Sequence, residues 1–213
     1  MKNGNYLLSL DVSTKTIGIG LFDLDTEKLM FLKHVSPVVK PKPESKMEEL
    51  FLKVDIFKNE FLKKYIDIGI KKVIIEQQLL ASNNIYTVET LLKFNGILSR
   101  WIYDILNIVP EYISSYAARK YCFPELMAKR THKKDGTPLT KKEIEKNKEV
   151  LFGGYHFDID KKEILLEKVS QIEPQINWLY DKNHKLKKES FDMSDAYVAG
   201  KAYLNIQKLD IKE

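Results

Sequence analysis

Short runs of apolar residues alternate with longer amphipathic stretches along this chain, and the alternation predicts a mixed α/β protein. Residues 6–11 and 17–22 are apolar runs separated by a tight polar turn, a pattern typical of a β-hairpin. Residues 29–35 predict a third strand, and the proline-rich stretch 37–43 ends this antiparallel meander.

Two long helices and two more strands are expected after the meander. Apolar side chains recur at three- and four-residue steps across residues 47–65 and 85–108, which predicts amphipathic helices. Between them, residues 72–76 are a short apolar run that predicts a fourth strand, and residues 111–115 predict a fifth. Small residues within 193–206 predict a last helix that packs closely on a sheet.

The order of these elements predicts the fold class. Three antiparallel strands, then helix, strand, helix, strand and further helices, indicate a mixed five-stranded sheet with helices on both faces. This order matches the ribonuclease H-like α/β architecture, although periodicity alone leaves it one candidate among several. Residues 1–213 are expected to form a single domain, because the chain is too short for two substantial ones. Residues 129–188 are expected to form a basic insertion before the last helix.

Composition and charge narrow the possible functions only modestly. The chain carries 35 Lys and Arg against 30 Asp and Glu, a net charge of +5 that suits a nucleic-acid partner or ordinary solvation. The single cysteine excludes an internal disulfide and a cysteine-based zinc site, and the four histidines lack ligand spacing. No apolar run has the length of a membrane span or the character of a signal peptide. An intracellular, cytoplasmic protein without a membrane partner or a small-molecule cofactor is expected.

Four acidic residues are the candidate catalytic residues and metal ligands. Asp11 and Glu76 end two apolar strands, while Asp192 and Asp195 lie one turn apart on one face of the last helix. Converging carboxylates repel one another unless a cation neutralises them. Oxygen donors without His or Cys favour Mg²⁺ or Mn²⁺, and one or two such ions can promote attack on a phosphodiester. The pattern therefore predicts a metal-dependent nuclease.

Each acid also has a purely structural interpretation. Asp11 could initiate a turn, and Glu76 could pair with a lysine such as Lys72. Asp192 could cap the last helix, with Asp195 as a favourable charge in its first turn. The joint pattern favours the metal site, because two strand ends and a helix start meet at one edge only in the right fold.

Three blocks of sequence resemble the RuvC-type Holliday junction resolvases. Residues 8–23 resemble the family's first hairpin, and residues 192–204 resemble its last helix. Residues 73–122 contain a strand ending in Glu-Gln, an Asn-containing loop, a helix interrupted by glycine, and a Tyr-Ala-Ala-Arg element. These features are Glu76-Gln77, Asn83-Asn84, Gly96 and Tyr116-Ala117-Ala118-Arg119.

The resemblance implies a homodimeric endonuclease that makes paired nicks in four-way DNA junctions with Mg²⁺. It assigns the metal ligands to Asp11, Glu76, Asp192 and Asp195. Bacterial members carry an aromatic wedge where this chain has Leu79, so that detail does not carry over. The long segment before the last helix is closer to viral and phage members, which makes a phage or virus origin an expectation.

Basic residues outside the four acids are candidates for phosphate contact. Residues 129–150 carry 8 basic against 4 acidic side chains. Lysine and arginine give salt-dependent, largely sequence-independent affinity, although a solvated charged helix has the same composition. The candidate nucleic-acid contacts are Lys15, Arg119, Lys129, Arg130, Lys133, Lys134, Lys141 and Lys142.

Other functions remain open at the level of sequence. A flap, duplex or RNA–DNA hybrid nuclease can use the same metal site. Residues 11–18 also resemble the first phosphate loop of actin-like ATPases and sugar kinases, although no second phosphate loop is evident. A catalytically inactive junction-binding protein is a further alternative, and the intact set of four acids argues against it.

Overall fold

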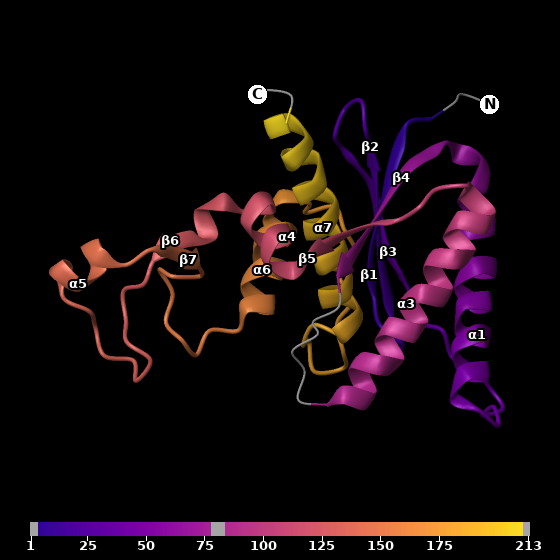
Figure 1. Ribbon diagram of the computed structural model, residues 1–213, viewed down its shortest axis with the longest axis horizontal. Coiled ribbons are helices and arrows are strands. Elements are labelled where there is room, and N and C mark those ends of the chain that lie inside the picture. The colour runs from indigo at the N-terminus through magenta and orange to yellow at the C-terminus, as the bar shows by residue number, and fades with distance from the viewer. Residues whose placement is uncertain (1–3, 78–83, 211–213) are drawn as a thin grey trace.

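A mixed sheet forms the centre of the computed structural model, which describes residues 4–77 and 84–210 (Figure 1). The described part contains a five-stranded sheet of order β3-β2-β1-β4-β5. The first three strands form an antiparallel meander, while β4 pairs with β1 and β5 pairs with β4 in parallel. The strands are β1 (Tyr6–Val12), β2 (Ile17–Asp23), β3 (Leu29–Val35), β4 (Ile70–Gln77) and β5 (Glu111–Ser114). The predicted ribonuclease H-like sheet is confirmed.

Helices cover both faces of this sheet, and a small hairpin lies apart from it. The helical elements are α1 (Lys46–Phe57), the π-helical η1 (Lys58–Leu62), α2 (Lys63–Tyr65), the 3₁₀ turn η2 (Ile66–Ile68), α3 (Ile85–Leu106), α4 (Ser115–Cys122), the 3₁₀ turn η3 (Pro124–Leu126), α5 (Lys141–Lys146), α6 (Lys161–Ile172) and α7 (Lys188–Asp210). The hairpin consists of β6 (Met127–Lys129) and β7 (Glu149–Leu151).

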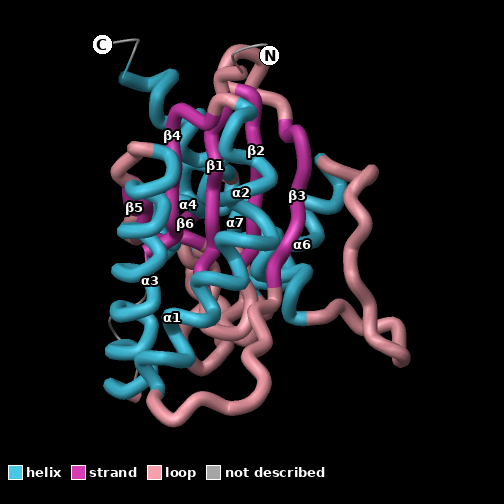
Figure 2. Tube along the Cα trace, turned by 90° about the vertical axis from the view of Figure 1, so that its right-hand side faces the viewer, coloured by secondary structure: helices cyan, strands magenta, loops and turns pink. Residues whose placement is uncertain are grey.

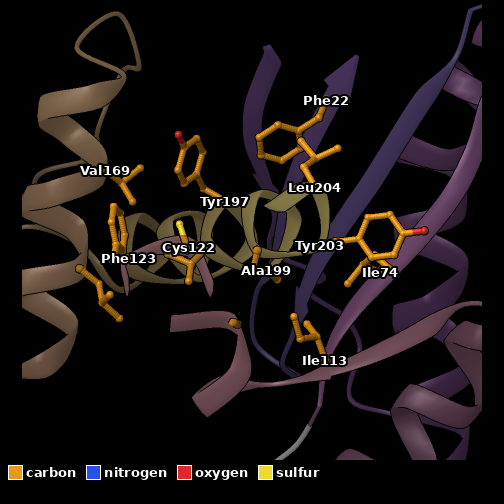
Figure 3. Packing of buried hydrophobic residues seen from close by; sticks show 14 of the residues in the cluster. Phe22, Ile74, Ile113, Cys122, Phe123, Val169, Tyr197, Ala199, Tyr203 and Leu204 are labelled. Carbon is orange, nitrogen blue, oxygen red and sulfur yellow. The ribbon is translucent and has the colours of Figure 1, made fainter. Parts of the chain in front are cut away.

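Two hydrophobic clusters lie on opposite faces of the sheet. Figures 1 and 2 show the helices that cover each face. Side chains alternate along a strand. In β1, Leu7 therefore packs in the cluster under α4, α6 and α7, while Leu8 and Leu10 pack in the cluster under α1 and α3. Figure 3 shows the first of these clusters, with Tyr197 of α7 among its buried side chains.

Close packing of α7 on the sheet depends on glycine. A Cβ at Gly200 would collide with the ring of Phe22, and a Cβ at Gly18 would collide with the backbone carbonyl of Asp192. Gly18 is also the cross-strand partner of Asp11 in β1. The missing side chain therefore lets the first turns of α7 approach the end of β1.

Two helices differ from their predicted form. The stripe over residues 47–65 predicted one helix, but a π-helical turn follows α1 and places both Phe61 and Leu62 in the core. The last helix begins at Lys188 rather than near Met193. The buried hydroxyl of Ser190 bonds the backbone N–H of Leu179 at 2.8 Å and its carbonyl at 3.0 Å, which fixes the preceding loop against this first turn.

The basic insertion, residues 129–188, contributes to the core through α6 and through Phe152, which follows β7. Leu165, Leu166 and Val169 of α6 are buried, although the surrounding sequence is highly charged. The part around β6, β7 and α5 projects from the sheet in Figure 1, where α5 lies at the far end. None of the described helices combines the length and apolarity that a membrane span requires.

Candidate active site

Asp11 and Glu76 lie side by side at the C-terminal ends of the neighbouring strands β1 and β4. Their strands are parallel neighbours, and Leu10 is paired with Ile75, the residue just before Glu76. Both carboxylates are half-buried. The structural alternatives are a turn initiated by Asp11 and a pairing of Glu76 with a lysine such as Lys72. Ser13, through its hydroxyl, closes the β1–β2 turn, and Lys72 pairs with Glu111 at 3.0 Å instead of Glu76.

Asp192 and Asp195 reach the same edge from α7. They are only 3% and 4% exposed, and Asp192 meets β2 at Gly18, directly across from Asp11. Because α7 begins at Lys188, Asp192 lies inside the helix and does not cap it. We call Asp11, Glu76, Asp192 and Asp195 the acid cluster.

The electrostatics show that the acid cluster is costly in its ionised form. Burial raises the pKa of Asp11 well above its usual value, and the charges of Glu76, Asp195 and Asp192 raise it further. Burial, together with the charge of Asp195, raises the pKa of Glu76 to about 8. Burial also raises the pKa of Asp192, against the opposing effects of Lys188 and Lys162. The interactions place all four carboxylates within electrostatic reach of one another.

Lys162 is a functional candidate that sequence analysis did not identify. Its Nζ donates a hydrogen bond to Oδ2 of Asp195 at 2.6 Å. Desolvation lowers the pKa of Lys162, but the charge and hydrogen bond of Asp195 outweigh that effect and raise it. Nothing in the sequence distinguishes Lys162 from its neighbour Lys161, because both belong to one basic run and only the tertiary fold brings Lys162 to the acids.

A cleft of about 250 Å³ opens onto three of the four acids. Arg119 and Lys162 contribute its cationic groups, and the charge of Arg119 lowers the raised pKa of Glu76. The two cations can bind a phosphate group in the cleft, next to the carboxylates. It is lined by Asp11, Glu76, Gln77, Thr87, Val88, Leu91, Ser115, Arg119, Lys162 and Asp195.

The chemistry of the acid cluster fits a hard divalent cation. Oδ2 of Asp192 is buried and accepts no hydrogen bond from the described residues, so this oxygen is available as a ligand. Over residues 4–77 and 84–210, however, no three His, Cys, Asp or Glu side chains are already placed to hold one ion. Metal binding therefore requires the carboxylates to turn toward a common point, and the ligand assignment stays a prediction.

The candidate nucleic-acid contacts fall into two groups. Arg119 lines the cleft and Lys15 lines a groove next to it. The other six belong to the basic insertion, in the part that projects from the sheet in Figure 1. Some of these side chains have local partners: Lys133 pairs with Glu143 at 3.7 Å, and the guanidinium of Arg130 lies 4.6 Å from the ring centre of Phe157. The structure therefore gathers Lys15 and Arg119 near the acids and keeps the others apart from them. Those others are Lys129, Arg130, Lys133, Lys134, Lys141 and Lys142.

Two positions of the predicted family pattern, Leu79 and Asn83, lie outside the described residues. The neighbouring Asn84 is described, and its side chain caps α3 by accepting from the backbone N–H groups of Tyr86 and Thr87.

Comparison with known proteins shows similarity in structure but not in sequence. No protein-family model matches the chain, and no curated protein matches it. RuvC of T. thermophilus in complex with a Holliday junction substrate has a TM-score of 0.58 at 9% identity, over 96% of this chain and 95% of that chain. Another Thermus thermophilus RuvC structure has a TM-score of 0.53 at 12% identity, over 96% of each chain.

A eukaryotic protein gives the same result. Ydc2, the yeast mitochondrial Holliday junction resolvase, has a TM-score of 0.54 at 9% identity, over 95% of this chain and 78% of that chain. Likenesses at such low identity concern the fold alone. The chain has the fold of the RuvC-type resolvases, within the ribonuclease H-like architecture.

Proposed function

We propose that this protein is a Mg²⁺-dependent endonuclease that resolves four-way DNA junctions. The observation that carries the proposal is the convergence of Asp11, Glu76, Asp192 and Asp195 at one edge of a RuvC-like fold. A shared fold does not by itself define a reaction. The proposal therefore rests on the acids and on the cations beside them, Arg119 and Lys162.

The acid cluster would hold one or two Mg²⁺ ions, and Mn²⁺ is expected to substitute. When bound, the metal supplies acidification of a water and neutralisation of the charge that develops on the phosphate and the leaving oxygen. Glu76 must lose its proton to act as a ligand, because burial raises its pKa to about 8. Activity is therefore expected to rise with pH up to about that value.

Arg119 and Lys162 would bind the phosphate and orient it in the cleft. Arg119 lies on α4, the helix that directly follows β5, and Lys162 reaches the cleft from α6. Their positive charges balance the phosphate, and their N–H groups donate to its oxygens. Because Lys162 donates to Asp195 at 2.6 Å, its hydrogen bond would be redirected when phosphate and cation enter.

Paired nicks require two acid clusters, so we propose that the protein acts as a homodimer. An exposed apolar face of α3 is a suitable surface for the second copy. Leu92 and Tyr103 are 50% and 41% exposed on this face, and a Cβ at Gly96 would contact no described residue outside the adjacent turns of α3 within 4 Å. Residues spaced by four and seven positions share one side of a helix, which makes this a continuous stripe.

The stripe is bordered by charge. Ion pairs between Glu89 and Lys93, and between Arg100 and Asp104, run along one flank. An apolar stripe with a polar border is the usual anatomy of a helix-mediated interface.

One experiment tests the proposed reaction. The protein is incubated with Mg²⁺ and a labelled synthetic four-way junction, in parallel with linear duplex, flap and RNA–DNA hybrid substrates of matched sequence. Symmetric nicks in opposite strands of the junction, without cleavage of the linear duplex, are the expected result. Cleavage of the hybrid alone would instead identify a ribonuclease H, and cleavage of flap or duplex alone would identify another nuclease with the same site. Glu111→Gln, an exposed acid on β5, serves as the control for loss of a carboxylate.

A further inference from the structure

A second concave site, with a volume of about 480 Å³, adjoins the cleft of the acid cluster. The two share Thr87 and Leu91 of α3, so a chain that leaves the cleft past these residues enters this groove directly. Lys15, Lys46 and Lys188 line it, and we call it the lysine groove. Nothing in the proposed cleavage chemistry requires these lysines.

The charge of the lysine groove comes from three separate parts of the chain. Lys15 stands in the β1–β2 turn, Lys46 is the first residue of α1 and Lys188 is the first residue of α7. No Asp or Glu is among the described residues that line the groove. Lys46 is paired with Glu49 at 2.8 Å. Lys15 and Lys188 supply the other two positive charges, and that of Lys188 also acts on Asp192. Such a surface binds an anion.

Helix ends add to the positive potential. The N-termini of α1, α3 and α7 all meet the groove, through Lys46, Tyr86 and Lys188. The backbone dipoles give each N-terminus about half a positive charge. The side chain of Asn84 already accepts hydrogen bonds from the backbone N–H groups of Tyr86 and Thr87. This end of α3 therefore adds positive potential, but these two N–H groups do not bind the ligand.

A partly buried lysine, Lys53, fixes the position of the β1–β2 turn against α1. Nζ of Lys53, on α1, donates to the carbonyl of Thr14 at 2.8 Å and pairs with Glu49 at 2.7 Å. These bonds connect the β1–β2 turn to α1, so that Lys15 and Lys46 both line one groove. The groove is therefore formed before any ligand arrives, which limits the entropy lost on binding.

An exposed aromatic side chain in the lysine groove is a second feature that suits a nucleic-acid ligand. Tyr86, in the first turn of α3, is 77% exposed although it lies beside the lysines. Aromatic faces next to a basic track stack with the bases of a strand that is not paired. Lysines repeated along a groove, together with one exposed ring, suit a sugar–phosphate chain better than a single phosphate ion.

We propose that the lysine groove binds the backbone of the cleaved DNA strand immediately beside the scissile phosphate, with Lys15 and Lys188 on phosphates and Tyr86 on a base. This inference rests on the proposed function, because the cleft must hold the scissile phosphate for the groove to hold its neighbour.

The test removes positive charges from the protein and single negative charges from the DNA, separately and together. Junction affinity is measured in Ca²⁺, used here to prevent cleavage, for the wild type and for Lys15→Met/Lys188→Met. The DNA carries one neutral methylphosphonate at successive positions on either side of the cut. We expect the double variant to bind about 10-fold or more weakly, with a salt dependence reduced by about two ions. At one or two positions next to the cut, a methylphosphonate should weaken the wild type and leave the variant unchanged.

Two controls make the outcome specific. Lys71→Met removes an exposed lysine at the opposite end of β4 from Glu76 and should retain wild-type affinity. Tyr86→Phe should bind as the wild type does, whereas Tyr86→Ala should weaken binding, because stacking needs the ring and not the hydroxyl.

The outcomes separate the two proposals. A wild type that cuts the junction, with methylphosphonate effects undiminished in the double variant at every position, would overturn the lysine groove alone. A wild type that neither binds nor cuts any junction would overturn both.

Discussion

Nζ of Lys162 lies 2.6 Å from Oδ2 of Asp195, so a lysine of α6 donates directly to a member of the acid cluster on α7. The side chain of Asp195 is only 5% exposed, whereas that of Lys162 is 48% exposed. A buried carboxylate needs a counter-charge, and a partly exposed lysine can supply it and still turn toward a ligand. The hydrogen bond between Lys162 and Asp195 should therefore affect both the stability of the fold and the proposed cleavage reaction.

Lys162→Met should impair both stability and cleavage. Loss of the ammonium leaves Asp195 buried without its partner, which we expect to lower the free energy of unfolding by about 1–3 kcal/mol. Single-turnover cleavage at saturating Mg²⁺ should fall by about 100-fold, as for removal of one group that stabilises developing charge. Urea unfolding and single-turnover kinetics measure the two effects. Lys161→Met is the matched control, because Lys161 precedes Lys162 in α6 and is exposed. Equal losses in both variants would exclude a specific role for Lys162.

Neutral variants of the acid cluster should separate binding from cleavage. Asp11→Asn, Glu76→Gln, Asp192→Asn and Asp195→Asn are each expected to reduce the cleavage rate at least about 1000-fold, because each removes a charged oxygen ligand. Junction affinity measured in Ca²⁺ by electrophoretic mobility shift should change little, since basic side chains carry it. Full activity in any of these variants would falsify the ligand assignment of that residue.

The acid cluster also predicts how stability depends on pH. Glu76 has a pKa of about 8 in the folded chain, above the ordinary value of 4.5, so the folded state binds more protons between these two values. Stability of the metal-free protein should therefore fall as pH rises through this window. A pKa raised by one unit corresponds to about 1.4 kcal/mol, so Glu76→Gln should stabilise the protein at pH 8.5 by the order of a few kcal/mol.

Denaturant titrations in EDTA at pH 5.5 and pH 8.5 check this prediction. Glu76→Gln should differ from the wild type far more at the higher pH, where the wild-type carboxylate is ionised. Adding Mg²⁺ should stabilise the wild type most at pH 8.5, because binding competes with protons. A wild type whose stability does not change between the two pH values, in the absence of metal, would contradict the raised pKa.

The projecting part of the basic insertion should act on affinity and not on chemistry. Replacement of lysines 133, 134, 141 and 142 by Met should weaken junction binding and flatten its salt dependence, because fewer counterions are released. The rate at saturating DNA should stay near that of the wild type, since these residues lie on or before α5, which projects from the sheet in Figure 1, and they do not line the cleft. A salt titration of affinity provides the measurement. An unchanged slope would identify the insertion as a solvated surface.

The sheet and the acids could be predicted because each leaves a local mark on the sequence. Asp11 and Glu76 interrupt apolar runs at strand ends, and the three-residue spacing of Asp192 and Asp195 defines one face of a helix. No local sequence pattern identifies Lys162 as a residue of the site. Its helix, α6, buries Leu165, Leu166 and Val169 within a run of charged residues, and only the tertiary packing on α7 aims its first turn at the cleft. The lysine groove is equally non-local, because its three lysines come from a turn and two distant helices.

Gly96 allows a test of the proposed homodimer in which folding and association are affected in opposite directions. A Cβ at this position has no contact within 4 Å with the described residues outside the adjacent turns of α3, and glycine inside a helix costs about 0.8–1 kcal/mol relative to alanine. Gly96→Leu should therefore leave the fold intact or stabilise it, while its side chain separates two copies packed through α3.

Sedimentation velocity should show a dimer for the wild type and a shift toward monomer for Gly96→Leu. Paired nicking of the junction should then give way to single nicks at low protein concentration, because one acid cluster cuts one strand. Met30→Arg, on the exposed side of β3, is the control for a change of surface character away from α3. A Gly96→Leu variant that stays dimeric would place the interface elsewhere on the molecule, and a wild type that is monomeric with junction DNA bound would contradict the homodimer itself.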